Sequence, residues 1–434
     1  MTTETEAIVV GAGPAGLALS RELSLRGVDH CLLERGRVGE RWRSERWDSL
    51  RLLSIAEQSA LPGLDHGDCD PESFIPAAAF ADYLTRYAST FAVPVVEHCA
   101  VTSVELHDGG YRVVGGGRAW NARAVIVAAG ACDVPYVPPC ATLLPSRVRQ
   151  IVPNDYRSPA DLPPGGMLVV GGSSTGLQIA EEVHASGRPV TLSVGEHTRM
   201  VRRYRGRDVL SWAGDAGILD DPADGARNVE AARRQPSLQL VGREDHRNLD
   251  LANMRKLGIR LAGRLTAING DIICFDDQLA QRAEASHARM LRVIERIDRY
   301  IDDNGLKAVP PDVGDLAPFD LGSTPVAIDL EADGIASVVW ATGYRRDYSW
   351  LKAPVLDAAG EVRQVGGVTE LPGLYIIGLT FLRRRRSNFI DGCGVDAAEI
   401  AQLVHQQLTQ PIQMRPHRSA ELDQCAAASS GASF

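Results

Sequence analysis

The sequence lacks several features that would place it outside ordinary globular proteins. It has no run of about eighteen apolar residues, so we expect no transmembrane helix. Its eight cysteines include no CxxC pair and no zinc-like spacing, which argues against a disulfide framework, a metal site and a dithiol redox pair. The net charge of −9 argues against a nucleic-acid-binding or anionic-membrane-binding surface. We therefore expect a cytoplasmic protein whose partners are small molecules.

The length of the chain predicts more than one domain. Its 434 residues are about three times the usual domain length, so two or three domains are expected. Hydrophobic residues make up 44% of the chain and charged residues 23%, as is typical of globular proteins.

A glycine-rich stretch near the N-terminus has the pattern of a dinucleotide-binding loop. Four apolar residues precede the segment 11–16 (GAGPAG), and an apolar helical pattern follows over 17–25. In such a loop the first glycine permits the turn, the second lets the backbone approach a pyrophosphate, and the third allows close helix packing. A second apolar strand ends at Glu34, 23 residues beyond Gly11, where an acid that binds a ribose diol is expected. The residues predicted to bind this dinucleotide are Gly11, Gly13, Pro14, Ala15, Gly16, Glu34 and Arg35.

The same unit occurs a second time along the chain. An apolar strand pattern leads into the segment 171–176 (GGSSTG), followed by a helical pattern and another strand. The position that matches Glu34 is Val194, and several arginines follow it. A missing acid with nearby arginines suits a 2′-phosphate, because guanidinium groups bind phosphate bidentately, so this unit is predicted to bind NADPH. The alternative is a solvated arginine-rich turn. The residues predicted to contact NADPH are Gly171, Ser173, Ser174, Thr175, Gly176, Arg199, Arg203 and Arg207.

Two dinucleotide-binding units in one chain imply a flavin that is reduced by a nicotinamide. The acid of the first unit suits the adenosine ribose of FAD, and FAD carries electrons that the protein itself cannot carry. Two further apolar strands, at 124–130 and 338–344, end in small residues and a glycine. Each is expected to turn beneath a bound nucleotide through Ala129, Gly130, Ala341, Thr342 and Gly343.

Other segments add a family resemblance to this pattern. They are 39–42 (GERW), 47–52 (WDSLRL), 204–208 (YRGRD) and 389–392 (FIDG). With the two glycine loops, they make the chain resemble the class B flavoprotein monooxygenases. This family includes flavin-containing monooxygenases, YUCCA-like enzymes and the bacterial CzcO-like flavoproteins, which are the most similar branch. The likeness extends from about residue 5 to 405.

The resemblance implies a specific reaction. NADPH reduces FAD, O2 adds at flavin C4a, and the resulting (hydro)peroxyflavin passes one oxygen atom to a small organic substrate, with N-oxygenation of an amine favoured over carbon or sulfur oxidation. No catalytic side chain is implied, because the flavin adduct is the reagent.

The resemblance also implies further contacts to FAD. Segment 39–42 would line the FAD site, segment 51–52 would lie near the isoalloxazine, and a helix beginning after Gly394 would direct its N-terminus at the flavin pyrimidine. Asp391 is a candidate for the ribityl contact, since Gly378-Leu379 stands where relatives have Gly-Asp. The residues added in this way are Gly39, Arg41, Trp42, Arg51, Leu52, Val101, Asp391 and Ala397.

We expect an α/β fold with two Rossmann-like dinucleotide-binding domains, the NADPH domain being inserted into a discontinuous FAD domain. A homodimer is possible. The expected boundaries are 1–160 and 325–410 for the FAD domain, 161–324 for the NADPH domain with a helical excursion at 280–303, and 411–434 for a flexible C-terminal tail.

Two other functions fit the same loops. One is an NADPH oxidase or electron-transfer flavoprotein reductase, although the missing CxxC argues against a dithiol acceptor. The other is a non-catalytic flavin redox sensor, which the departure of segment 152–156 from the histidine-containing fingerprint of relatives favours. The run Arg383–Arg386 is either a solvated surface or a site for an acidic substrate or cofactor phosphates.

Overall fold

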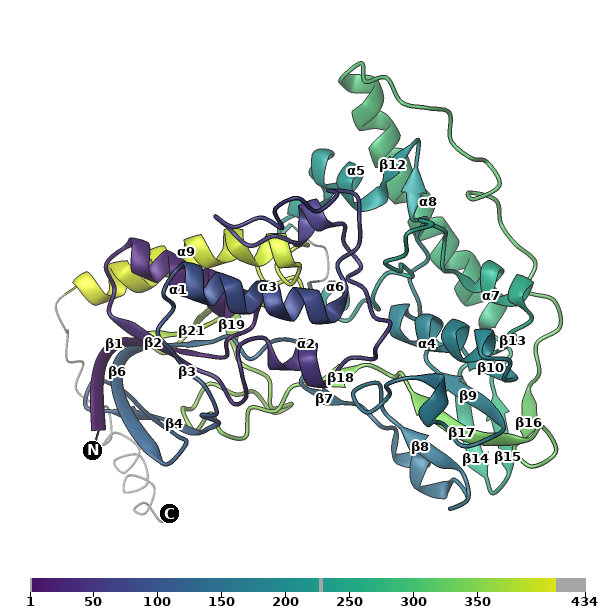
Figure 1. Cartoon of the computed structure of the whole chain (residues 1–434), viewed down its shortest axis with the longest axis horizontal. Helices are drawn as coiled ribbons and strands as arrows, with labels where there is room; N and C mark the ends of the chain where they lie inside the picture. Colours follow the sequence, from purple (N-terminus) through teal and green to yellow (C-terminus); the bar gives the residue numbers. More distant parts are fainter. Residues whose placement is uncertain (1, 226–228, 411–434) are drawn as a thin grey trace, which may run out of the picture.

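The computed structural model describes residues 2–225 and 229–410, and the expected tail 411–434 lies outside them. Two α/β layers lie side by side, each built on its own parallel sheet (Figure 1). Within the described residues no helix is long and apolar enough to cross a bilayer.

The first sheet holds the N-terminal glycine loop. Its strands follow the order β19-β20-β21-β6-β1-β2-β3, and β1, β2, β3, β6 and β21 run parallel. Strands β4 and β5 form an antiparallel hairpin, and β5 pairs with β6. The strands are β1 (Thr2–Val10), β2 (His30–Leu33), β3 (Val95–Val96), β4 (Val101–His107), β5 (Gly110–Gly115), β6 (Arg118–Val127), β19 (Gln364–Val365), β20 (Val368–Thr369) and β21 (Leu374–Ile376).

Three helices pack on one face of this sheet, where their apolar residues form a continuous core with β1 and β6. The helices are α1 (Pro14–Leu25), α3 (Ala77–Thr90) and α9 (Ile390–Thr409), and the short α2 (Glu40–Ser44) contacts α3. Helix α3 begins at Ala77. Pro76 fixes the extended backbone immediately before the helix.

The second sheet holds the second glycine loop. Its five strands are parallel in the order β13-β10-β9-β17-β8, and a small antiparallel sheet, β14-β15-β16, adjoins it. The strands are β8 (Arg149–Ile151), β9 (Gly166–Val170), β10 (Val190–Ser193), β13 (Arg260–Ala262), β14 (Leu265–Asn269), β15 (Ile272–Phe275), β16 (Ala327–Asp329) and β17 (Ile335–Trp340). The helices α4 (Ser174–Ala185) and α7 (Leu251–Leu257) belong to this layer.

The sheet assignment corrects the expected boundaries at residues 160 and 325. Strand β17 was expected in the FAD domain, but it lies in the second sheet between β9 and β8, with Val338 in register with Leu168. The chain crosses between the layers at β7 (Val134–Pro135) and β18 (Tyr344–Arg345), which pair antiparallel. A buried apolar strand fits either parallel sheet equally well, so its composition could not assign it to one of them.

A helical excursion rises from the second layer (Figure 1). Its longest element, α8 (Leu279–Asp303), matches the helix predicted over 280–303. The apolar face of α8 packs around Trp212 in a separate core, as its i, i+4 spacing predicts. The other elements of the excursion are β11 (Arg203–Tyr204), β12 (Arg207–Asp208) and α5 (Val209–Asp215). The short helix α6 (Val229–Arg233) lies closer to the first layer, where Arg233 donates to the carbonyl of Phe381.

The last helix begins earlier than the sequence predicted. It starts at Ile390 rather than after Gly394, so Gly392 and Gly394 lie inside it. A Cβ on Gly392 would lie 1.9 Å from the carbonyl oxygen of Arg386, and one on Gly394 would lie 2.5 Å from Pro62. These glycines therefore permit close packing and do not end a helix. Ala397 is consequently buried in the core against α1 and does not face a cofactor.

Candidate functional site

The first glycine loop has the backbone geometry of a nucleotide-binding turn. Gly11 has a φ of +112°, and a Cβ there would lie 2.6 Å from the carbonyl oxygen of Ala128. A Cβ on Gly16 would lie 2.0 Å from the carbonyl oxygen of Gly11. By contrast, a Cβ on Gly13 would meet no atom within 4 Å. The loop is thus closed against its own sheet and open at the glycine that would approach a pyrophosphate.

A cavity of about 440 Å³ opens in front of this loop, within the usual range for ligand pockets. The N-terminus of α1 faces it and carries no acidic residue in its first turn, so its amide groups favour an anion there. The predicted residues that line the cavity are Gly11, Gly13, Pro14, Ala15, Glu34, Arg35, Gly39, Arg41, Trp42, Val101, Ala129 and Gly130.

The predicted ribose-binding acid is held at the end of β2. One carboxylate oxygen of Glu34 accepts a hydrogen bond from the amide of Ala12 at 2.8 Å, and the other accepts one from the amide of Gly36 at 2.9 Å. These bonds fix the carboxylate at the wall of the cavity. Its remaining lone pairs can accept hydrogen bonds from a ribose diol. The loop, the open glycine and this acid together fit the adenosine half of FAD.

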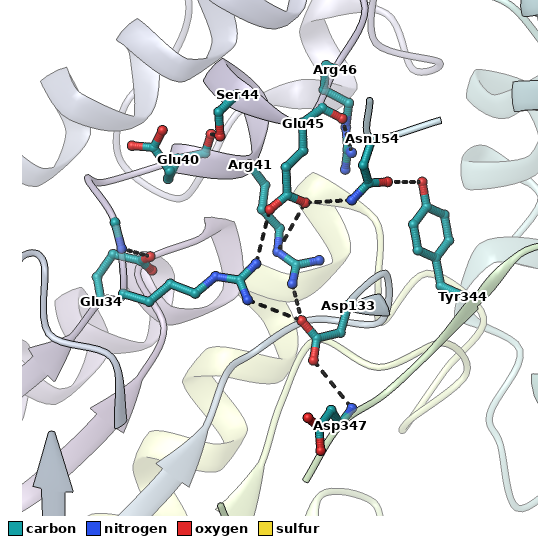
Figure 2. Close-up of polar contacts among 12 residues, drawn as sticks. Glu34, Glu40, Arg41, Ser44, Glu45, Arg46, Asp133, Asn154, Tyr344 and Asp347 are labelled. Atoms are coloured by element: carbon teal, nitrogen blue, oxygen red, sulfur yellow. Dashed lines mark hydrogen bonds and ion pairs between the residues drawn. The ribbon is translucent and has the colours of Figure 1, made fainter. Parts of the chain in front are cut away.

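Figure 2 shows a polar network beside the cavity that the sequence did not predict. Arg35 and Arg41 both pair with Asp133, and Arg35 also contacts Glu45 at 3.1 Å. The other oxygen of Glu45 accepts a hydrogen bond at 2.9 Å from Asn154, whose amide oxygen accepts one at 3.0 Å from the hydroxyl of Tyr344. This chain of contacts links α2 to β18, where the chain crosses between the layers.

The opposite wall of the cavity comes from the C-terminal part of the chain. It includes Asn388, Phe389 and Ile390 at the start of α9, so the N-terminal end of this helix faces the cavity. Asp391 does not line it. Its carboxylate pairs with Arg386 at 3.2 Å, and burial raises the pKa of Asp391 above its usual range. Within the motif at 389–392, Phe389 and Ile390 line the cavity, whereas Asp391 does not.

The second glycine loop repeats the geometry of the first. Gly171 has a φ of +127°, and a Cβ there would lie 2.1 Å from the carbonyl oxygen of Ala341. A Cβ on Gly176 would lie 1.9 Å from the carbonyl oxygen of Gly171. Ala341, which follows β17, thus lies beneath the second loop. The hydroxyl of Thr342 donates to the carbonyl of Tyr136, and Gly343 accepts from the amide of Tyr136, so both lie at the crossing between layers.

Comparisons with known proteins agree with this geometry. A family model described as pyridine nucleotide-disulphide oxidoreductase matches residues 8–210. An uncharacterized CzcO-like oxidoreductase of Geobacillus kaustophilus is 29% identical over 90% of this chain and 96% of its own length. The probable indole-3-pyruvate monooxygenase YUCCA1 of Arabidopsis thaliana is 32% identical over 40% of this chain and 43% of its own. A flavin-containing monooxygenase structure from Stenotrophomonas maltophilia has a TM-score of 0.66 at 19% identity, covering 93% of this chain and 99% of that one.

The chain is therefore similar to class B flavoprotein monooxygenases in sequence and in fold. It is a flavin-dependent oxidoreductase, and its relatives imply the use of FAD and NADPH. Its mixed α/β architecture is that of FAD- and NAD(P)-binding oxidoreductases.

A short segment of this chain lies over the second glycine loop. The side-chain amide of Gln239 donates to the carbonyl of Gly172 at 2.7 Å. The hydroxyl of Ser174 donates to the carbonyl of Leu240 at 3.0 Å and accepts from Gln178. The hydroxyl of Ser174 is therefore engaged within the protein and is not directed at a cofactor. Two further predicted residues lie at the start of α4: Ser173 at the N-cap position and Thr175 in the first turn.

Two residues predicted to lie near the isoalloxazine lie outside the cavity wall. Arg51 pairs with Glu244 at 2.9 Å and donates to the carbonyl of Phe74. Leu52 is buried in the first core, and a Cβ on Gly242 would lie 2.0 Å from its carbonyl oxygen. Arg51 and Leu52 therefore contact residues 242–244, which follow the segment that lies over the second loop.

The three arginines predicted to bind a 2′-phosphate have structural partners. Arg199 is buried, pairs with Asp250 at 3.0 Å and donates to two backbone carbonyls. Arg203 pairs with Glu72 at 2.9 Å. Arg207 pairs with Asp215 at 2.8 Å and stacks on the ring of Trp212. The cluster follows the expected strand in sequence, but its guanidinium groups bind carboxylates of the protein, one within the helical excursion and two on segments outside it.

The arginine run at 383–386 is also neutralised by carboxylates. Each of its members pairs with at least one acid, and two of these acids come from the excursion. The acids are Asp220, Asp221, Asp391, Asp396 and Glu399. The run thus ties the excursion to the first layer and is not a free surface for an acidic substrate.

Proposed function

We propose that the chain is an NADPH-dependent FAD monooxygenase that transfers one oxygen atom from O2 to a small organic substrate. The observation that carries this proposal is the pair of glycine loops with matching geometry, the first of which opens on a cavity with an acid at the end of the second strand. Curated relatives named as indole-3-pyruvate monooxygenases and a structural neighbour named as an S-allyl-L-cysteine S-oxygenase support the reaction class.

The residues of the chain would bind and orient the two nucleotides. Bound FAD supplies the reduction and oxygen chemistry. Glu34 would hold the adenosine ribose, the backbone at Gly13 would approach the pyrophosphate, and the N-terminal end of α9 would favour negative charge at the flavin ring. The loop at 171–176 would hold the pyrophosphate of NADPH.

We further propose an amine substrate ahead of carbon or sulfur compounds. Two carboxylates, Asp133 and Asp347, line the cavity away from the glycine loop. The backbone amide of Ser349 donates to Asp347 and holds the pKa of that carboxyl below its usual range. A carboxylate that stays ionised near the reacting ring would attract the ammonium form of an amine.

The test follows the oxygen atom. The purified FAD-loaded protein is given NADPH and 18O2 with tertiary amines, thioethers or ketones, and the label in the products is measured with the hydrogen peroxide released. We expect label in the amine product and less than one peroxide per NADPH oxidised. One peroxide per NADPH with every compound would instead make the protein an NADPH oxidase or reductase. Bound flavin without NADPH turnover would make it a redox sensor.

A further inference from the structure

The carboxyl ends of β10 and β13 form a joined edge beside the second glycine loop. The amide of Val194 donates to the carbonyl of Ala262 at 3.0 Å, and the hydroxyl of Ser193 donates to the carbonyl of Gly263 at 2.9 Å. A Cβ on Gly172, within the loop, would lie 2.6 Å from the side chain of Val194. In a Rossmann layer this is where the adenosine ribose lies, at the end of the second strand.

One arginine reaches this edge from the neighbouring strand. Arg264 follows β13, and its side chain crosses Gly195, where an added Cβ would lie 3.1 Å from Nε. Its side chain is 53% exposed. The carboxylate of Glu196, which is 55% exposed, lies 4.0 Å from its guanidinium. Any larger residue at position 195 would push this arginine away from the edge.

The second arginine near Glu196 already forms a salt bridge with another carboxylate. Arg282, in the first turn of α8, is only 11% exposed, and both ends of its guanidinium pair with Asp276. Its Nε lies 3.4 Å from Glu196. Since Arg282 is held by a partly buried bidentate pair, its guanidinium is not free to bind a ligand. Arg264, with one loosely placed and solvated partner, can exchange that partner for a phosphate.

We infer that Arg264 binds the 2′-phosphate of the NADPH adenosine and that Glu196 opposes it, so that this pair sets the preference between NADPH and NADH. An acid near the end of the second strand accepts hydrogen bonds from a ribose diol, whereas an arginine there accommodates a 2′-phosphate. This chain presents both groups at one position. The inference rests on the proposed function, because it assigns a role within the proposed NADPH site.

Binding of 2′,5′-ADP and of 5′-ADP to the FAD-loaded protein, measured by calorimetry, tests this assignment without turnover. We expect Arg264→Ala to weaken 2′,5′-ADP binding by about 10- to 100-fold, the loss of a charge-assisted contact, and to change 5′-ADP binding by less than about 2-fold. We expect Glu196→Gln to strengthen 2′,5′-ADP binding and to weaken that of 5′-ADP. Arg260→Ala is the matched control, since Arg260 lies at the other end of β13 and pairs with Asp333.

The outcomes separate the inference from the proposed function. Equal effects of Arg264→Ala and Arg260→Ala on 2′,5′-ADP would overturn the assignment of Arg264 while leaving the nucleotide site standing. Weaker or unchanged 2′,5′-ADP binding in Glu196→Gln would overturn the opposing role of Glu196. If the unaltered protein bound neither nucleotide, the NADPH site of the proposed function would be wrong and this inference with it.

Discussion

The two glycine-loop units share a backbone and differ in what surrounds it. Gly11 and Gly171 both have positive φ, and both lie against the carbonyl of an alanine that directly follows a strand, β6 or β17. The third glycine of each loop packs on the carbonyl of the first at about the same distance, 2.0 Å and 1.9 Å from an added Cβ. The glycine pattern therefore specifies the turn and the helix packing, and it does so equally in both units.

The surroundings of the loops specify the ligand. In the first unit, Glu34 is fixed at the end of β2 by two backbone amides and lines an open cavity. In the second, Val194 stands at that position, the polar groups lie beyond it at Glu196 and Arg264, and Gln239 covers the loop. Two loops with the same backbone geometry can therefore differ in how accessible they are to a ligand.

The largest expected effect separates the roles of the two loops. In Gly16→Val and Gly176→Val the new side chain has no room beside the carbonyl of the first glycine. We expect Gly16→Val to abolish flavin retention, and Gly176→Val to keep the flavin but to slow its reduction by NADPH more than 100-fold. Absorbance of bound flavin and anaerobic reduction rates measure this. Flavin retained in the first variant, or normal reduction in the second, would break the division of roles.

A second prediction concerns the arginines of the second unit. Arg202 is fully buried, pairs with Asp208 at 2.6 Å and donates to the carbonyl of Leu53. Its replacement leaves a buried carboxylate unpaired, so we expect Arg202→Met to lower the free energy of unfolding by about 3–5 kcal/mol. The adjacent Arg203→Met removes only a half-exposed pair with Glu72 and should cost about 0–1 kcal/mol. Urea titrations measure both. Equal losses would show that the cluster does not stabilise the excursion in this way.

A third prediction concerns the middle residue of each loop, which is Gly13 in the first and Ser173 in the second. Gly13 has extended backbone with open space at its Cβ position, so alanine should be tolerated by the fold. We expect Gly13→Ala to leave the melting temperature of the apoprotein unchanged and to weaken FAD binding by about 10-fold, because the methyl group occupies the approach to the pyrophosphate. Ser173→Gly is the matched change in the second unit and should affect NADPH alone. Weaker FAD binding in Ser173→Gly would contradict the assignment of the loops.

The smallest expected effect is the pH dependence that His30 contributes in the first unit. His30 begins β2. Its Nδ1 donates to the carbonyl of Val28 at 2.9 Å, its Nε2 is hydrogen-bonded to the hydroxyl of Ser20 at 2.7 Å, and burial lowers its pKa. The unfolded chain therefore binds the extra proton first as the pH falls, and stability that is present above about pH 6.5 is lost below it. The strand β10 has Val190 in the corresponding place.

We expect His30→Gln to flatten the loss of stability between pH 7.5 and pH 5.5, by at most about 1.4 kcal/mol per pH unit for one proton. Thermal unfolding at several pH values measures this, with His405→Gln on α9 as the control. A slope that is the same in His30→Gln and in the unaltered protein would remove His30 as its source.

Much of the first site could be predicted from the sequence because its determinants are local. The glycine spacing, the apolar strand and the acid at its end lie within residues 7–34, and each restricts the backbone or a ligand contact by itself. The family motifs added Gly39, Arg41 and Trp42, all of which line the cavity. The long amphipathic helix was predictable for the same reason, since its period appears within one segment.

Other features depended on contacts between distant segments. Strand β17 has the composition of any buried parallel strand, and only its pairing with β9 and β8 assigns it to the second sheet. Gly394 resembled a helix boundary, but Gly392 and Gly394 both lie inside α9, where the close approach of Arg386 and Pro62 requires glycine.

The sequence by itself determined that the chain has two glycine turns, an acid suited to one ribose and arginines after the other strand. The tertiary structure decided which arginine side chains are free to bind a phosphate and which are paired with carboxylates. Arg199, Arg203 and Arg207 are used by carboxylates from other elements, whereas Arg264, 70 residues beyond Val194, reaches the nucleotide edge. A guanidinium binds the nearest well-placed anion, and that anion is set by packing between elements far apart in the chain.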